Sequence, residues 1–224
     1  MDGLPRTEFS PETMALLVDA GTRRRYPART FLFHEADPPA TVFLVERGMV
    51  RVERTLRSGR TILLTLAVPG ELLGELAVVD PASHSATAQT IVDSRVLAIP
   101  AERFEELMRD HSELAFTVLA RVTDRLRGLT EQFVEATSLT ASARVATRLL
   151  ALVRAAEAGP GPDGVVEMRL PISQEELAQW AGLSREGAVR GLSDLRSAGV
   201  LETGRMRVFI HDLAALEKEA TRTA

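Results

Sequence analysis

The chain has 224 residues, of which 45% are hydrophobic, and it contains no cysteine. This length fits two domains, and the lack of cysteine excludes disulfides, iron–sulfur clusters and thiol redox chemistry. The formal net charge of -4 excludes a globally basic protein, so any binding to nucleic acid must come from a local group of arginines.

The sequence has neither a membrane span nor an export signal. Its longest apolar runs, such as Ile62 to Val68, are far shorter than the roughly 20 residues that a transmembrane helix needs. The N-terminus lacks the apolar core of a signal peptide. We therefore expect a cytoplasmic protein with no membrane partner.

The first hundred residues are predicted to form one short helix and then a series of strands. Ser10 and Pro11 are typical of the N-cap and first position of a helix, which we expect to run to about Ala20. The clearest strands are predicted at residues 42–45, 49–53, 61–67 and 95–99. Gly48 separates the first pair at the spacing of a hairpin, and Ser58-Gly59 separates the next. Many short strands at such intervals indicate a barrel or a sandwich.

A helical period begins after Pro100. It predicts a short helix over residues 101–109 and a long one from Ser112 to about Thr137. Apolar residues of the long helix step by three and four along one stripe, as in the seam of a coiled coil. A helix that packs on the barrel would show the same stripe, but the length of this one favours a dimer seam. The stripe consists of Leu114, Ala115, Val118, Leu119, Val122, Leu126, Leu129 and Phe133.

The C-terminal region carries the pattern of a helix-turn-helix. A polar break at residues 137–140 is interpreted as a hinge, and a helix at residues 144–156 is followed by a loop at residues 159–164. Ser173 and Glu176 have the spacing of a capping box at the start of the next helix. Gly182 is suited to end that helix, and Ser184 to cap a second one that runs to about Ala198.

The second helix of this motif carries residues that can read bases. Arg185, Glu186 and Arg190 lie near its N-terminal end, which is the end that enters the major groove. Arginine binds guanine with two hydrogen bonds, and glutamate accepts one from cytosine. Residues 199–210 are predicted to form a hairpin with Gly204 in its turn. This hairpin would carry Arg205 and Arg207 to DNA phosphates. An exposed helix face can also hold such charges for solubility alone, but the motif around them favours DNA binding.

In this order, the motifs resemble those of the Crp/Fnr family of cyclic-AMP-receptor-like transcription regulators. The resemblance spans residues 10–213 and rests on Ile172–Ala178, Gly182–Glu186, Gly70-Glu71, Gly74–Leu76 and His84–Thr87. It implies an α+β fold in three parts. These are a cyclic-nucleotide-binding-like β-barrel (jelly roll) at residues 1–111, a dimerisation helix and hinge at residues 112–138, and a winged helix-turn-helix at residues 139–224.

The resemblance also implies partners and DNA-binding residues. We expect a homodimer that binds an inverted-repeat operator, with its half-sites about one helical turn apart, and that acts with RNA polymerase. The residues expected to contact DNA are Ser173, Ser184, Arg185, Glu186, Arg190, Arg205 and Arg207.

The effector pocket departs from the family pattern at one position. In members that bind cyclic nucleotides, a Gly-Glu-Leu segment holds the phosphate and the ribose, and an arginine followed by a serine neutralises the phosphate. Gly74–Leu76 matches the first segment, but His84 and Ser85 stand where the arginine and serine are expected. Histidine can replace the arginine only when protonated, so binding of an anion should strengthen as the pH falls through the neutral range. The candidate effector-binding residues are Leu64, Thr65, Gly74, Glu75, Leu76, His84, Ser85, Arg125 and Thr130.

Three interpretations of the pocket stay open. It binds a small effector such as a cyclic nucleotide, with cyclic AMP as one candidate; it is vestigial in a regulator that needs no effector; or the barrel senses a cyclic nucleotide to control a partner protein.

The recognition helix also departs from the family, since Ala188 and Gly191 replace larger aliphatic residues. Gly187 and Gly191 should each cost about 1 kcal/mol of helix stability, so this helix is expected to be looser or packed closer to a neighbour.

Catalytic and metal sites are not expected. The sequence has no nucleophile motif, no glycine-rich phosphate loop before a helix and no clear pair of carboxylates, so we do not expect an enzyme. No two of His34, His84, His111 and His211 have the spacing of metal ligands, which argues against a metal or haem site.

Overall fold

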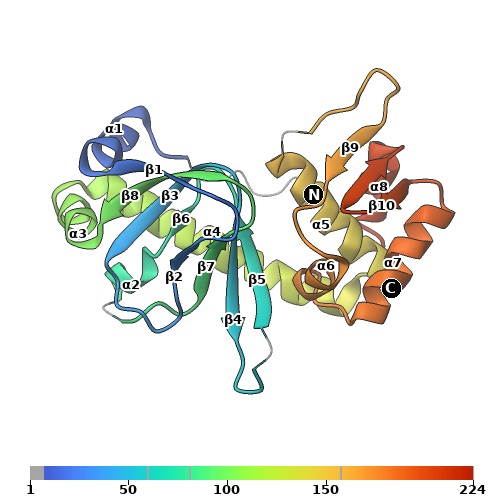
Figure 1. Ribbon diagram of the computed structural model, residues 1–224, viewed down its shortest axis with the longest axis horizontal. Coiled ribbons are helices and arrows are strands. Elements are labelled where there is room, and N and C mark those ends of the chain that lie inside the picture. The colour runs from blue at the N-terminus through green and yellow to red at the C-terminus, as the bar shows by residue number, and fades with distance from the viewer. Residues whose placement is uncertain (1–7, 60, 81, 157, 224) are drawn as a thin grey trace. The chain divides into compact units, whose positions relative to one another are not determined.

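The computed structural model describes residues 8–59, 61–80, 82–156 and 158–223. The chain forms two compact units, one ending at Leu129 and the other beginning at Thr130 (Figure 1). This boundary lies inside the long helix.

The first unit contains two antiparallel sheets of four strands each, in the orders β1-β8-β3-β6 and β2-β7-β4-β5. Their inner faces share one core, to which Val45 and Val96 contribute from the first sheet and Val50 and Ala88 from the second. This confirms the predicted barrel. The elements of this unit are α1 (Pro11–Ala20), β1 (Thr22–Tyr26), β2 (Phe31–Phe33), β3 (Thr41–Arg47), β4 (Val50–Thr55), β5 (Thr61–Ala67), β6 (Leu72–Leu73), α2 (Leu76–Val79), β7 (Thr87–Thr90), β8 (Ser94–Pro100), α3 (Ala101–Asp110) and the first part of α4 (Ser112–Ser138).

The prediction of a hairpin at Gly48 was wrong. The strands on either side of it, β3 and β4, belong to different sheets, so the chain crosses from one sheet to the other here. Gly48 has a φ of 96°, and a Cβ atom on it would lie 2.3 Å from the Ser94 Oγ atom. Only glycine fits such a crossing. The hairpin at Ser58-Gly59 is confirmed, because β4 pairs with β5.

Helices cover the outer face of the first sheet. Leu44 and Leu97 alternate along β3 and β8 with the inward-facing valines and pack against α1, α3 and the start of α4 (Figure 1). Burial on both faces explains why β3 reads as a continuous apolar run and not as an alternating one. Leu114 and Val118 of α4 belong to this outer core. The assignment of these two residues to a dimer seam was therefore wrong, and packing on the barrel accounts for them.

The rest of the apolar stripe on α4 behaves differently. Leu119, Leu126, Leu129 and Phe133 are all exposed, Leu126 by 63% and Phe133 by 73%. The helix itself has the predicted extent, from Ser112 to Ser138.

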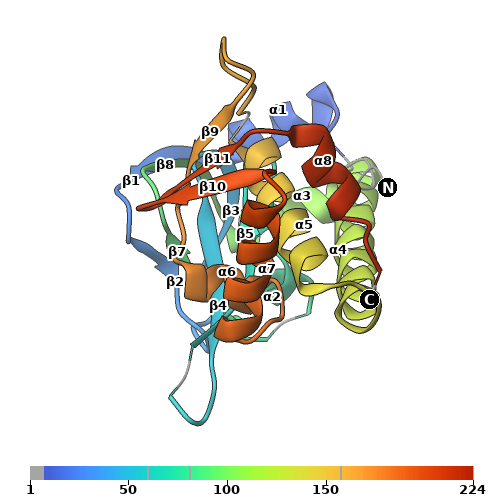
Figure 2. The ribbon, with the colours of Figure 1, turned by 90° about the vertical axis from the view of Figure 1, so that its right-hand side faces the viewer.

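The second unit is a winged helix-turn-helix, and Figure 2 shows its three-stranded sheet beside the helices. The strands follow the order β10-β11-β9, with both pairs antiparallel. After the end of α4, its elements are α5 (Ala141–Ala155), β9 (Val166–Arg169), α6 (Gln174–Trp180), α7 (Arg185–Ser197), β10 (Leu201–Gly204), β11 (Arg207–Ile210) and α8 (Leu213–Glu219).

The wing differs from the prediction in its turn. Gly204 is the last residue of β10 and pairs with Arg207, so the turn consists of Arg205 and Met206. Met206, not the glycine, takes the positive φ, at 57°.

One small residue of α7, Gly191, faces α5. Ala188 is buried, and a Cβ atom on Gly191 would lie 2.7 Å from the carbonyl oxygen of Ala141 and 2.9 Å from its carbonyl carbon. The start of α5 therefore touches the backbone of α7 directly. Of the two expectations for this helix, close packing against a neighbour is the one that the structure supports, and it is the reason for glycine at position 191.

Two matched substitutions in α7 test this close packing. Gly191→Ala should destabilise the protein by about 1–3 kcal/mol, because the new methyl group overlaps backbone atoms of α5 that cannot rotate away. Gly187→Ala is the control, since its Cβ atom meets nothing closer than 3.4 Å. It should be neutral or stabilising by up to about 1 kcal/mol. Denaturant unfolding of both variants provides the measurement, and equal effects would contradict the packing described here.

Candidate DNA-reading helix and effector pocket

Local capping fixes both helices of the helix-turn-helix. The Ser173 Oγ atom accepts a hydrogen bond from the Glu176 amide at 3.2 Å, and the Glu176 carboxylate accepts one from the Ser173 amide at 2.7 Å. At the start of α7, the Ser184 Oγ atom accepts a hydrogen bond from the Gly187 amide. Gly182 makes the turn between the helices with a φ of 62°. These features confirm the predicted capping box, turn and second cap.

Two arginines that the sequence analysis did not single out hold this turn from α5. The Arg144 side chain donates hydrogen bonds to the carbonyl oxygens of Ala181, at 2.9 Å, and Gly182. The Arg148 Nε atom donates one to the carbonyl oxygen of Trp180 at 3.2 Å. The last carbonyl groups of α6 have no partner within the helix, so these arginines act as its C-terminal cap.

The same arginines reach the last turns of α4. The Arg148 Nη2 atom lies 2.6 Å from a carboxylate oxygen of Glu135, and the Arg144 Nη1 atom lies 3.5 Å from the carbonyl oxygen of Ala136. Burial, and then the nearby charge of Arg148, lower the pKa of the Arg144 guanidinium, while Glu135 acts in the opposite direction. The sequence signal for this pair is the four-residue spacing of Arg144 and Arg148, which places both on one face of α5 among apolar residues.

The outer face of α7 is open to solvent and bears charges of both signs. A shallow hollow on it is lined by Arg185, Glu186, Val189, Arg190, Ser193 and Asp194. Arg185, Glu186 and Arg190 are exposed, and none of the three forms an ion pair within the part of the chain that the structure describes. The structure thus brings the three predicted base-reading residues onto one accessible surface.

The two arginines of the wing are not equivalent. Arg205 lies exposed in the turn. Arg207 forms an ion pair with Glu167 on β9. The carboxylate neutralises part of the charge that Arg207 would offer to a phosphate. Ser173 and Ser184 are exposed, but the Oγ atom of each already accepts a capping hydrogen bond.

In the barrel, the carboxylate that the family resemblance assigns to a ribose already has a partner. Glu75 is only 3% exposed, and one of its carboxylate oxygens lies 2.8 Å from the Arg125 Nη1 atom. Arg125 also donates a hydrogen bond to the carbonyl oxygen of Leu72. The buried negative charge of Glu75 is therefore balanced by an arginine of α4.

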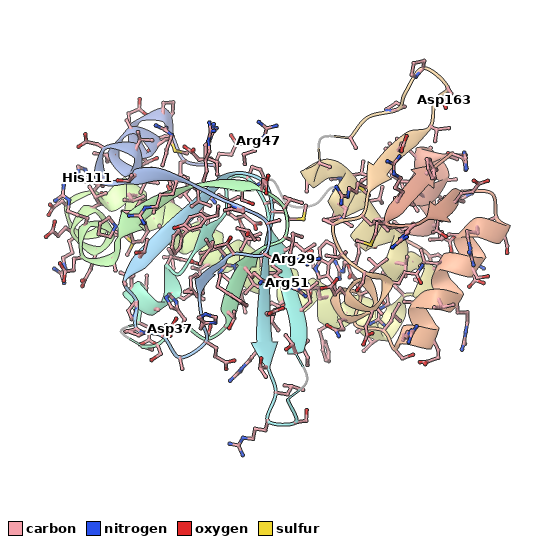
Figure 3. The ribbon with its side chains drawn as sticks, viewed as in Figure 1. Arg29, Asp37, Arg47, Arg51, His111 and Asp163 are labelled. Atoms are coloured by element: carbon pink, nitrogen blue, oxygen red, sulfur yellow. The ribbon has the colours of Figure 1, made fainter. Side chains whose placement is uncertain are left out.

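His84 is packed into the wall of the barrel. It is 6% exposed, and its ring stacks on Phe33 with centroids 3.9 Å apart and an angle of 18° between the planes. Burial lowers the pKa of the His84 imidazole, although Asp37, labelled in Figure 3, has a weaker opposite effect. Burial therefore disfavours the charged form of His84, and any gain in anion binding from its protonation is expected at a lower pH than for an ordinary histidine, whose pKa is about 6.5.

Of the other candidate effector residues, Gly74 lies against this wall. Gly74 has a φ of 87°, and a Cβ atom on it would lie 2.9 Å from the carbonyl oxygen of Thr41 and 3.2 Å from the His84 ring. Leu64, Leu76 and Ser85 are exposed, and Thr65 is half-buried on β5. Thr130 lies on α4, five residues beyond Arg125.

The described residues contain no group of three or more histidine, aspartate or glutamate side chains that could hold a metal ion. None of the helices described is both long enough and apolar enough to cross a membrane.

Comparison with known proteins places the chain in a family. A cyclic nucleotide-binding domain model matches residues 23–111, and a Crp-like helix-turn-helix domain model matches residues 143–219. The "Cyclic AMP receptor protein" of Thermus thermophilus is 34% identical over 212 residues, which cover 95% of this chain and 94% of that protein. A "CRP-like cAMP-activated global transcriptional regulator" of Mycobacterium tuberculosis is 27% identical over 94% of this chain and 93% of its own length.

A solved structure shows the same architecture. The "c-di-GMP Responsive Global Regulator CLP" of Xanthomonas campestris superposes with a TM-score of 0.74 at 26% identity, covering 90% of this chain and 99% of that one. The chain belongs to the Crp/Fnr family of transcription regulators, with a cyclic-nucleotide-binding domain and a helix-turn-helix DNA-binding domain.

Proposed function

We propose that this regulator binds an inverted repeat in DNA as a homodimer, and that α7 of each subunit reads one half-site. The observation that carries this proposal is the exposed group of Arg185, Glu186 and Arg190 on a helix whose opposite face is packed against α5. Arginine and glutamate side chains without internal partners are free to bond to base edges in a major groove.

Three successive segments of the chain are proposed to have different roles. Residues 1–111 form the sensing domain, residues 112–138 the dimerisation helix and hinge, and residues 139–224 the DNA-binding domain. The exposed residues Leu119, Leu126, Leu129 and Phe133 support the dimer, because their steps of seven, three and four follow one coiled-coil seam. RNA polymerase is included as a partner because the chain is a transcription regulator of this family.

A small-molecule effector is proposed to control the barrel, but the barrel is proposed to bind cyclic AMP weakly or not at all, although two relatives are named for cyclic AMP and one for cyclic di-GMP. The charges of Glu75 and Arg125 balance each other, and burial disfavours the charged form of His84. A phosphate diester would thus enter a pocket in which the usual arginine charge is missing, and burying an unpaired anion is costly.

Substitutions on α7 and the wing test DNA binding. Arg185→Ala should cost about 1–3 kcal/mol of binding free energy and relax the sequence preference at one base pair, because a bidentate base contact is lost. Arg205→Ala should weaken binding to all sequences alike and flatten the salt dependence, because only a phosphate contact is lost. Titration of the best-bound sequence and of its single-base variants at several salt concentrations separates these effects.

Arg207→Ala is the matched control for the wing. Its ion pair with Glu167 should make its effect on the salt dependence smaller than that of Arg205→Ala. An unchanged sequence preference in Arg185→Ala would show that α7 does not read bases.

Calorimetric titration with cyclic AMP tests the pocket. The wild type should bind weakly at pH 8, and any gain from protonation of His84 should come at a lower pH than an ordinary imidazole would give, because burial lowers the pKa of His84. His84→Arg should bind more tightly and with no pH dependence in this range, because it restores a permanent charge. Tight, pH-independent binding by the wild type would disprove the proposed lack of affinity.

A further inference from the structure

The outer face of α7 carries one large aliphatic side chain, and the base-reading residues described above do not account for it. Val189 is 45% exposed, whereas the other apolar residues of α7, every one of which the structure describes, are buried against the rest of the unit. It lies in the hollow that Arg185, Glu186, Arg190 and Ser193 also line.

The position of Val189 on the helix places it among the side chains that face DNA. It follows Arg185 by four residues and Glu186 by three, so all three lie on neighbouring positions of one helix face. It also directly precedes Arg190. A helix that inserts these charged side chains into a major groove therefore brings Val189 into the same groove.

Base pairs offer one apolar feature in the major groove, which is the 5-methyl group of thymine. Arg185 and Arg190 have the chemistry to recognise guanine, and Glu186 that to recognise cytosine. The guanidinium and carboxylate groups of these side chains gain nothing from contact with a methyl group, because they must stay hydrogen-bonded. The branched side chain of Val189 does, because contact removes apolar surface of both partners from water.

We propose that Val189 is a specificity-determining residue that contacts the 5-methyl group of a thymine within each half-site, next to the base pairs contacted by Arg185 and Arg190. This inference rests on the proposed function and adds to it the preference for one particular base.

Replacement of thymine by deoxyuridine tests the contact, because this change removes only the methyl group. Each thymine of the best-bound sequence is replaced in turn, in both half-sites at once, and binding is measured by titration. At one position, this replacement should weaken DNA binding by the wild type about 15-fold. Loss of one methyl group should cost about fourfold in affinity, and the two half-sites multiply this effect. Val189→Ser should bind the thymine and deoxyuridine forms of that position equally well.

Arg205→Ala is the matched control. It should bind all DNA more weakly and still show the wild-type ratio between thymine and deoxyuridine, since the wing does not reach the methyl group. Two results overturn the inference while leaving DNA reading by α7 intact. One is sequence-specific binding without a deoxyuridine effect at any position, and the other is a full deoxyuridine effect in Val189→Ser. Binding by the wild type without any sequence preference overturns the proposed function itself.

Discussion

The arrangement of the DNA-binding unit depends on how two buried arginines cap the C-terminal end of α6. The carbonyl oxygens of Trp180, the last residue of α6, and of the two residues after it accept hydrogen bonds from the guanidinium groups of Arg144 and Arg148 on α5. Gly182 is part of this constraint, because a Cβ atom there would lie 2.6 Å from the Arg144 Nη2 atom. The arginines hold the turn, and Gly191 allows α7 to pack directly against α5. The inner face of α7 is therefore covered, and its outer face is the one that DNA can reach.

The two units differ in how far they retain the residues that the family uses. In the DNA-binding unit, the capping serines, the turn glycine and the charged residues of α7 are all present and exposed or bonded as the motif requires. In the barrel, the Gly-Glu-Leu segment is present, but its glutamate is paired with Arg125, and the arginine position holds a buried histidine whose pKa is lowered by burial. A regulator of this kind can keep its mode of reading DNA while its response to small molecules changes, since separate residues carry the two functions.

Local features of the structure were predictable from the sequence, and contacts between distant residues were not. The capping box of Ser173 and Glu176 and the extent of α4 depend on neighbours three or four residues away. The crossing at Gly48, by contrast, depends on contact with Ser94, and the caps on α6 join residues more than 30 positions apart. The pairing of Arg207 with Glu167 and the burial of His84 also depend on contacts between residues that are distant in the sequence. Strands β1 and β2 were not predicted, because β1 is rich in arginine and β2, with only three residues, is too short to show a pattern.

Whether two copies of α7 read DNA together is tested most directly by selecting binding sites from random duplex DNA with the purified wild-type protein, without added nucleotide. A dimer with one recognition helix in each of two successive major grooves should enrich an inverted repeat whose half-sites are about one helical turn, 10–10.5 base pairs, apart. Enrichment of a single half-site would contradict the dimer, and a pool with no common sequence would contradict DNA reading by α7.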